Sequence, residues 1–325
     1  MSVLVSVVIP TYRRPQLLER CLRALVAQSF DPGRYEIVVA DDADDPHTKQ
    51  QVLSWRQRVR GPTQILYVPV WDRHGPAAAR NAGWRLAAGR VIAFTDDDTI
   101  PRRDWIARGL AAMRDGVAAA AGRVYVPLPQ GRPSDYERDA SRLGTGEFVT
   151  ANCFVRRDAL AAIGGFDERF TAAWREDSDL FFTLLEAHGK VVAAPAAVVI
   201  HPVRPASWGV SLKQQRKILF DALLYKKHAA LYRRMIRRTP RWDYYAIVLA
   251  LAVAVVAAAA GWTGVAAVAF AFWAGGTASF CVRRLRGTSH APAHIVEMVA
   301  TSILIPPLAV FWRLVGAIRF GAFVA

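Results

Sequence analysis

Val91-Ile92-Ala93-Phe94-Thr95-Asp96-Asp97-Asp98 joins a short apolar run to three consecutive aspartates. Four apolar residues in a row predict a strand buried on both faces, as in a parallel sheet covered by helices. In an extended segment alternate side chains point the same way, so Asp96 and Asp98 can converge while Asp97 points away. Ligands of such sheets bind beyond the carboxyl ends of the strands, where these aspartates stand.

The first two hundred residues repeat this arrangement of strands and helices. Apolar runs predict strands at 4–9, 36–40, 64–68 and 91–94, and helical spacing predicts helices at 17–27, 52–59 and 77–88. This alternation indicates an α/β domain with an open, mostly parallel, Rossmann-like sheet. We expect the domain to span residues 1–206.

Two common nucleotide-binding signatures are missing from the sequence. Pro10-Thr11-Tyr12-Arg13-Arg14 follows the first strand in place of G-x-G-x-x-G, and G-x-x-x-x-G-K-[ST] does not occur. We therefore expect neither a dinucleotide dehydrogenase nor a P-loop NTPase. A divalent cation on the carboxylates of Asp96 and Asp98 could neutralise phosphates instead, because Mg²⁺ and Mn²⁺ accept such oxygen ligands. A solvated acidic turn is the alternative for this segment taken alone.

The basic residues gather in the C-terminal third of the chain. The 325 residues carry 42 Lys and Arg against 27 Asp and Glu, a formal net charge of +15. Residues 1–206 have a net charge of +3 and residues 207–325 a net charge of +12. We interpret residues 207–243 as basic amphipathic helices that lie on anionic phospholipid headgroups. Nucleic-acid binding is the alternative, and the apolar segment that follows disfavours it.

Residues 244–282 contain no charged side chain. As one helix they would extend roughly 58 Å, about twice the hydrocarbon core of a bilayer, so they predict a transmembrane hairpin. A third apolar run contains Pro306-Pro307 and either crosses the membrane kinked or re-enters it. The expected membrane segments, within residues 244–325, are about 244–260, 265–282 and 296–314. A buried helical hairpin in a soluble domain is the alternative.

Charge around the hairpin predicts its orientation. Basic residues at 213–241 precede the first span, Arg283, Arg284 and Arg286 follow the second, and the turn at 261–264 is uncharged. By the positive-inside rule, the N-terminal domain lies on the cytoplasmic side of a multi-pass inner-membrane protein. The first residues carry no basic region, so we expect no signal peptide, and we expect the three cysteines to stay reduced.

Six motifs occur in a recognisable order, at 7–12, 36–42, 75–83, 95–98, 164–168 and 174–177. Together they resemble the family 2 glycosyltransferases, inverting enzymes with the GT-A fold, across about residues 3–206. The motif at 75–83 is similar to G-x-x-x-A-R-N-x-G, that at 95–98 to D-x-D, and that at 174–177 to the catalytic E-D segment. The resemblance implies an enzyme that transfers a sugar from a nucleotide sugar to an acceptor.

The resemblance also implies roles for single residues. Asp177 would be the general base, with Glu176 in support, and apolar neighbours would raise its pKa toward what a base needs. The nucleotide sugar would contact Pro10, Thr11, Arg13, Asp41, Asp42, Arg80, Asp96 and Asp97, with Asp41 slightly favoured over Asp42 for the base. Mn²⁺ or Mg²⁺ would bind Asp98, Asp96 and His201, and the acceptor side would include Gly165, Phe166, Trp174 and Arg175.

Each of these residues also has a purely structural interpretation. Acidic residues such as Glu176 and Asp177 favour the first turn of a helix. A lone histidine such as His201 is usually structural, and Arg80 could cap a helix or pair with a carboxylate. Taken within the ordered set of motifs, the catalytic interpretation of Asp177 is the favoured one.

Two positions depart from the family pattern. Processive membrane synthases of the family carry Q-x-x-R-W, whereas this chain has Gln214-Gln215-Arg216-Lys217-Ile218. We therefore expect transfer of one or a few sugars rather than polymer export. Ala43 stands where the family often has glycine, which is a minor change.

The sequence thus predicts a membrane-anchored, metal-dependent, inverting glycosyltransferase of cell-envelope glycan or glycolipid synthesis. We expect a UDP, GDP or dTDP sugar as donor, a lipid-linked or membrane-proximal acceptor, and no nucleic-acid partner. One alternative is transfer to a polyprenyl phosphate, which needs no general base because the acceptor is already an anion. Another is a non-catalytic nucleotide-sugar-binding scaffold in a glycan assembly complex.

Overall fold

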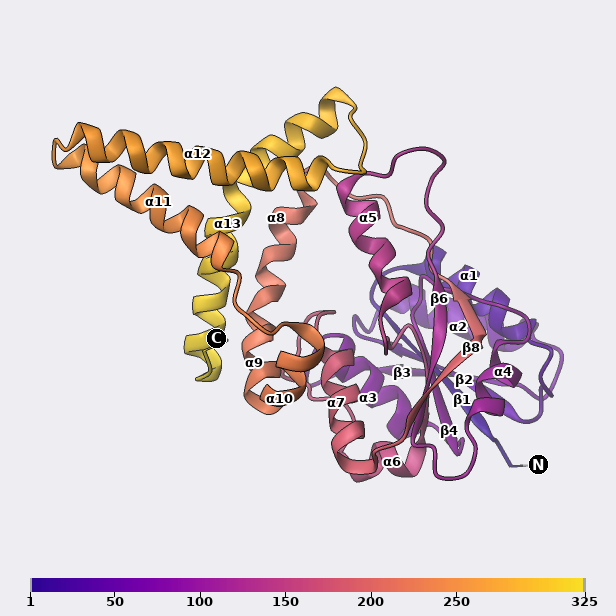
Figure 1. Cartoon of the computed structure of the whole chain (residues 1–325). Helices are drawn as coiled ribbons and strands as arrows, with labels where there is room; N and C mark the ends of the chain where they lie inside the picture. Colours follow the sequence, from indigo (N-terminus) through magenta and orange to yellow (C-terminus); the bar gives the residue numbers. More distant parts are fainter. Residues whose placement is uncertain (1, 324–325) are drawn as a thin grey trace. The chain divides into compact units, whose positions relative to one another are not determined.

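The computed structural model describes residues 2–323, which form two compact units. Of the described residues, the first unit comprises 2–127 and 141–203, and the second comprises 128–140 and 204–323. Figure 1 shows the sheet and its covering helices in the first unit and a group of helices in the second. Each unit is described by itself below.

One mixed sheet of eight strands, in the order β3-β2-β1-β4-β7-β6-β8-β5, forms the first unit. The strands are β1 (Val5–Thr11), β2 (Tyr35–Asp41), β3 (Gln64–Pro69), β4 (Val91–Thr95), β5 (Ile100–Pro101), β6 (Ala119–Tyr125), β7 (Asn152–Arg156) and β8 (Val191–Ile200). The four strands β3-β2-β1-β4 are parallel, which confirms the expected Rossmann-like α/β arrangement. Antiparallel β7 interrupts this pattern between β4 and β6.

Helices cover the sheet because successive side chains of its strands point to opposite faces. On β1, Val7 and Ile9 pack into one apolar cluster with Leu22 of α1, whereas Val8 packs into another with Trp84 of α3. The helices of this unit are α1 (Pro15–Val26), α2 (Pro46–Arg58), α3 (Pro76–Leu86), α4 (Trp105–Ala112), α6 (Arg157–Ala162) and α7 (Glu176–His188), with a 3₁₀ turn at Arg142–Thr145. Two buried layers thus fix the strand ends where the aspartates stand.

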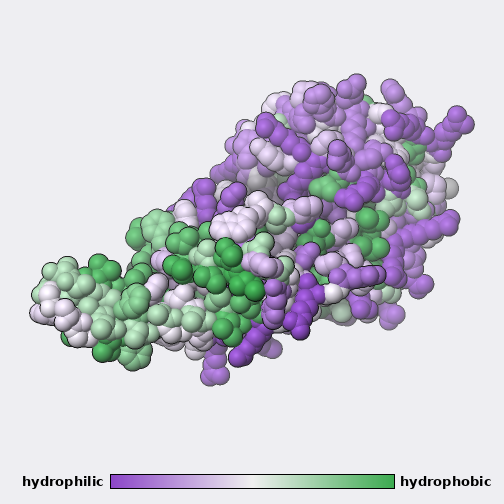
Figure 2. All heavy atoms as spheres, turned by 90° about the horizontal axis from the view of Figure 1, so that it is seen from above, coloured by the Kyte–Doolittle hydropathy of each residue, from purple (hydrophilic) through white to green (hydrophobic). Residues whose placement is uncertain are grey.

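The second unit contains helices and loops, and no strand among the described residues. After most of α5 (Asp135–Ser141) it contains α8 (Val210–Gln214), a 3₁₀ turn at Gln215–Ile218, α9 (Leu219–Lys227), α10 (Ala229–Leu231), a π-helical turn at Tyr232–Ile236, α11 (Trp242–Ala259), α12 (Thr263–Leu285) and α13 (Pro292–Phe320). The last three are long and apolar enough to cross a membrane, as the sequence predicted. Figure 2 shows hydrophobic side chains gathered over the α11–α12 hairpin.

The basic segment before the hairpin, residues 209–227, packs along α13. The backbone N–H of Gly209 donates to Glu297 Oε1 at 2.7 Å, near the start of α13. Near the end of α13, the centroids of the Phe220 and Phe320 rings lie 6.2 Å apart. Gly316 has no side chain where the Leu219 carbonyl passes; a Cβ there would lie 2.4 Å from that oxygen. The apolar side chains of α9 are therefore buried against protein, a packing that the amphipathic interpretation did not foresee.

Candidate active site

The three aspartates after β4 lie in a turn rather than in an extended strand. The Asp96 carbonyl accepts hydrogen bonds from the backbone N–H and the hydroxyl of Thr99, at 3.2 and 2.8 Å. Carboxylate oxygens of Asp96 and Asp98 and a ring nitrogen of His201 lie within 4.8 Å of one another. The turn therefore brings together the residues expected to converge, although strand alternation is not the cause.

His201 reaches this cluster because β8 pairs with the short strand β5. Ile200, the last residue of β8, is the pairing partner of Ile100. The imidazole Nε2 of His201 consequently lies 3.3 Å from Asp98 Oδ1. Two carboxylates and an imidazole form a ligand set that suits Mn²⁺ and is also open to Mg²⁺.

Asp97 points away from that cluster and joins the loop after β1 to the turn after β4. Its Oδ2 accepts from the hydroxyl of Thr11 at 2.8 Å, and its Oδ1 lies 3.3 Å from Nη1 of Arg14. Burial raises the pKa of Asp97 to about 6. Two residues expected to bind the nucleotide sugar, Thr11 and Asp97, thus bind each other.

Arg80 of α3 connects the acidic cluster to the start of α7. Its Nη2 donates to Asp96 Oδ1 at 2.8 Å, and its Nη1 donates to Glu176 Oε1 at 3.2 Å. The side chain is only 3% exposed. Burial alone would lower the pKa of Arg80, but the Asp96 and Glu176 carboxylates outweigh it and raise the pKa. Arg80 pairs with carboxylates, which was the structural alternative for this residue.

The two acidic residues that open α7 differ in their access to solvent. Glu176 is 5% exposed, and burial, with the neighbouring Asp177 charge, raises its pKa to about 7. Asp177 is only partly buried, and its Oδ1 accepts from the backbone N–H of Ser178 at 2.7 Å. Burial also raises the pKa of Asp177, against the lowering effect of that N–H. Asp177 is therefore the carboxylate that an incoming group can reach.

The segment expected on the acceptor side is held by Asn81 of α3. The Asn81 side chain accepts from the backbone N–H of Phe166 and donates to its carbonyl, both at 2.9 Å. Gly165 has a φ of 82°, and a Cβ there would lie 2.5 Å from Asn81 Oδ1. Trp174 is 38% exposed, and the guanidinium of Arg175 lies 4.6 Å from the centroid of its ring. Trp174 and Arg175 thus offer a stacked surface beside Asp177.

Asp41 and Asp42 have different surroundings although they are neighbours at the end of β2. Asp41 is fully buried and accepts from the backbone N–H groups of Ala43 and Asp45 and from the Tyr67 hydroxyl, at 3.1, 2.8 and 3.0 Å. Asp42 is partly exposed, and its Oδ1 lies 3.1 Å from Nδ1 of His74. Asp42 Oδ2 also accepts from the backbone N–H of Gly75 at 2.8 Å, and the Asp42 side chain is 13% exposed. Asp41, slightly favoured by the sequence, thus fixes its own loop, whereas Asp42 holds the loop before α3 with part of its carboxylate exposed.

Two further residues expected to contact the nucleotide sugar, Pro10 and Arg13, lie in and after the end of β1. Pro10 is partly buried, whereas Arg13 is exposed, has a φ of 51° and places its guanidinium 5.5 Å from the centroid of the Tyr12 ring. Arg14 and Asn81 were missed as site-forming residues. Asn81 stands inside the motif at 75–83 and could have been found there, but nothing local in the sequence links Arg14 to Asp97.

Three side chains at the strand ends that could hold a cation are thus joined through Arg80 to the paired acidic residues of α7. The profile of the family described as Glycosyl transferase family 2 matches residues 6–164, and that of Glycosyl transferase family group 2 matches residues 91–310. The chain belongs to the family 2 glycosyltransferases and uses a nucleotide-sugar donor. This membership contradicts the non-catalytic scaffold.

Several relatives share part of this chain. The glycosyltransferase AglE of Haloferax volcanii is 27% identical over 228 residues, 66% of this chain and 71% of that protein. Validoxylamine A glucosyltransferase of Streptomyces hygroscopicus is 29% identical, over 66% of this chain and 52% of that protein. The succinoglycan biosynthesis protein ExoM of Rhizobium meliloti is 33% identical, over 59% of this chain and 65% of that protein. The chain thus spans between about half and 71% of these relatives.

Solved structures confirm the GT-A fold. The mannosyltransferase PcManGT from Pyrobaculum calidifontis, in complex with GDP-Man and Mn²⁺, aligns with a TM-score of 0.60 at 19% identity, over 96% of this chain and 88% of that chain. GalNAc-T7 with UDP, GalNAc and Mn²⁺ aligns with a TM-score of 0.52 at 18% identity, over 72% of this chain and 56% of that chain.

Proposed function

We propose that this chain is a membrane-anchored, metal-dependent, inverting glycosyltransferase whose acceptor is presented at the cytoplasmic face of the inner membrane. The observation that carries the proposal is the bridge formed by Arg80. One buried guanidinium binds Asp96 of the cation-binding set and Glu176 beside the accessible Asp177. A donor-diphosphate region and a base are therefore held in one rigid arrangement within the first unit.

The donor end of this arrangement would be formed by residues at the strand ends. Asp96, Asp98 and His201 would hold Mn²⁺ or Mg²⁺, which when bound supplies positive charge against the leaving diphosphate. Their donor atoms fit such an ion, and Mn²⁺ in the PcManGT and GalNAc-T7 structures supports the assignment. Asp42, which is partly exposed whereas Asp41 is fully buried, would accept hydrogen bonds from the nucleotide base.

At the acceptor end, Asp177 would act as the general base. As the acceptor oxygen forms its bond to the anomeric carbon, its proton passes to the Asp177 carboxylate. The bond from that carbon to the diphosphate breaks on the opposite face, and the electron pair leaves with the diphosphate, so the configuration inverts. Glu176 and Arg80 would position Asp177, and Trp174 would offer a face for the acceptor.

The anchor in this proposal is the α11–α12 hairpin. Its helices have uncharged middle sections and expose apolar side chains such as Val256, Val268 and Phe272. The hairpin turn is uncharged, whereas Asp243, Arg283 and Arg284 stand at the opposite end. An inserted hairpin with its charged end at the cytoplasmic headgroups satisfies both features.

For α13, we place the helix along the membrane surface rather than across it. The basic segment 209–227, which contains Lys213, Arg216 and Lys217, runs beside it for most of its length, so a crossing α13 would take these charges into the bilayer. Six of its exposed apolar side chains recur at helical spacing and form one stripe, Val296, Val299, Ile303, Phe311, Leu314 and Ile318; Ile295 and Leu304 are exposed as well. A helix lying in the interface requires such a stripe.

A membrane-surface anchor supports a lipid-linked acceptor, in cell-envelope glycan or glycolipid synthesis. The name of the relative ExoM, which refers to succinoglycan biosynthesis, points to the same kind of product. Because Lys217 and Ile218 stand where processive synthases have Arg and Trp, we expect transfer of one or a few sugars.

The test is transfer of labelled sugar to a membrane-lipid extract by the full chain and by Asp177→Asn. We expect a loss of about 10²–10⁴-fold, the usual contribution of a general base. Asp104→Asn, which changes an exposed aspartate bonded to Arg108, is the control and should retain activity. Undiminished transfer by Asp177→Asn to a polyprenyl phosphate would refute the base and support direct transfer to that anion.

A further inference from the structure

Arg313 of α13 is a buried cation with too few partners. Its side chain is 10% exposed, and its Nη2 lies 3.7 Å from Asp221 Oδ2, an ion pair too long for a hydrogen bond. The Nε and Nη1 atoms are buried and have no hydrogen-bond partner among the described residues. Three N–H donors of a guanidinium therefore lack acceptors, at a considerable cost in free energy.

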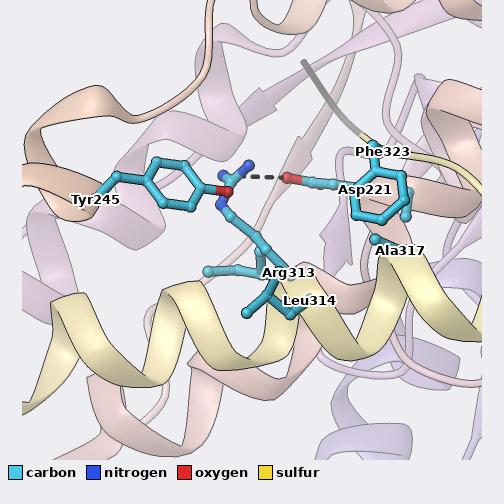
Figure 3. A pocket seen from close by; sticks show the side chains of 8 residues that line it. Asp221, Tyr245, Arg313, Leu314, Ala317 and Phe323 are labelled. Carbon is cyan, nitrogen blue, oxygen red and sulfur yellow. Dashed lines mark ion pairs between the residues drawn. The ribbon is translucent and has the colours of Figure 1, made fainter. Parts of the chain in front are cut away.

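A small cavity adjoins these donors. It has a volume of about 30 Å³ and is lined by Ile218, Asp221, Ala222, Tyr245, Arg313, Leu314, Ala317 and Phe323. Figure 3 shows the Arg313 guanidinium between the Tyr245 ring and the Asp221 carboxylate. One water needs about 10–15 Å³ of such space, so the cavity has room for more than one oxygen-sized atom. Arg313 thus lies beside space that an acceptor group can enter.

The surroundings of the cavity carry excess positive charge. Arg237, in the loop before α11, is partly buried, and its pKa is lowered first by burial and then by the charges of Arg241 and Arg313. The charges of Arg241 and Arg313 both act on Arg237, Asp243 pairs with Arg241 at 2.8 Å, and Asp221 is the one carboxylate among the residues that line the cavity. An anion in the cavity would relieve both this repulsion and the unmet donors.

We propose that this cavity binds the phosphate group of a membrane lipid. Guanidinium binds phosphate oxygens with strong, charge-assisted hydrogen bonds. Tyr245 lies in the first turn of the hairpin helix α11, so the cavity stands at the headgroup level of the anchor. Leu314, Ala317 and Phe323 give it an apolar wall that suits the first carbons of a lipid. This proposal rests on the membrane anchor in the proposed function, and it does not depend on the glycosyltransferase reaction.

The experiment measures binding of dihexanoyl phosphatidic acid to the purified full chain in a nonionic detergent, by isothermal titration calorimetry. We expect one lipid per chain, and an affinity at least about tenfold weaker in Arg313→Gln. Arg319→Gln removes an exposed charge from the same helix and should change the affinity less than about twofold. Asp221→Asn should bind more tightly, because a competing carboxylate is gone.

One further variant and two further probes make the result decisive. Arg313→Gln combined with Asp221→Asn removes both charges of this ion pair, so we expect the double variant to fold, as its thermal midpoint checks, and still to lose the lipid. Unchanged binding in that variant would overturn the proposal. Equal binding of dihexanoylglycerol, which has no phosphate, or of inorganic phosphate, which has no lipid, would overturn it as well. Transfer activity is not measured, so failure here is distinct from failure of the glycosyltransferase proposal.

Discussion

Arg80 is the residue on which the geometry of the centre depends. Its two terminal nitrogens reach two carboxylates from different elements, the turn after β4 and the start of α7. A lysine at this position would place one ammonium where a planar fork is required. The charge would be kept, but the spacing between Asp96 and Glu176 would not.

We therefore expect Arg80→Lys to fold and to lose about 10²-fold in kcat, as for misplaced catalytic groups. Arg85→Lys, on the same helix and 56% exposed, is the matched control and should keep near-parental kcat. Steady-state kinetics with a saturating nucleotide sugar measure both. If Arg80→Lys matched the parent in kcat, Arg80 would have no positioning role.

The pH dependence of activity follows from the two acidic residues of α7. Burial raises the pKa of Glu176 to about 7 and also raises that of Asp177. A general base works only when deprotonated, so kcat should rise with pH through the titration of this pair and level off above it. A profile from pH 5 to 9 should place the acidic limb near neutrality. A flat profile above pH 5 would show that the acting carboxylate has its ordinary pKa.

At the scale of elements, packing against α3 holds the segment at 164–168, which we propose lies on the acceptor side. Gly165 and Gly116 both have positive φ, 82° and 75°, but only Gly165 lies against another residue. Gly165→Ala should therefore destabilise the fold by about 1–3 kcal/mol more than Gly116→Ala does. Denaturant unfolding of the two variants measures the difference. Equal effects would mean that the contact with Asn81 contributes nothing.

Local patterns were sufficient for the first four strands, the three helices between them and the apolar helices, but not for β5 to β8, α4, α6 or α7. Apolar runs placed β1 to β4, and hydropathy with length placed α11 and α12, because these signals come from burial along one segment. The convergence of Asp96 and Asp98 was also foreseen, although a turn and not an extended strand produces it.

Contacts between segments that are far apart in the sequence could not be predicted from these local patterns. The bond between Thr11 and Asp97 joins residues 86 positions apart, and Asp41 is occupied by N–H groups of a loop whose conformation no periodicity encodes. The burial of α9 depends on Gly316, almost a hundred residues later. Such pairings are determined by the packed fold. The sequence therefore identified the candidate residues but could not predict which of them bind one another and which remain exposed.

At the scale of the whole molecule, the proposed position of α13 predicts the side on which each of its ends lies. A surface helix leaves Ala322 on the same side as the residues before α11, whereas a crossing helix would move it to the other side. Thr263, at the start of α12 and exposed, should lie across the membrane in either case.

Cysteines at these positions can be labelled in intact cells with a membrane-impermeant maleimide. We expect Thr263→Cys to react without permeabilisation and Ala322→Cys to react only after it. Two of the native cysteines, Cys21 and Cys153, are buried, and a parent control corrects for Cys281. Reaction of Ala322→Cys in intact cells would show that α13 crosses.

The most direct test of a metal-dependent, lipid-directed glycosyltransferase is incorporation of sugar from labelled UDP, GDP and dTDP sugars into organic-extractable product by membranes that contain the chain. We expect one donor class to give product, EDTA to reduce it by at least about 100-fold, and Mn²⁺ or Mg²⁺ to restore it. Asp98→Asn should stay inactive when the metal is returned. Undiminished incorporation in EDTA, or by Asp98→Asn, would contradict the role assigned to Asp96, Asp98 and His201.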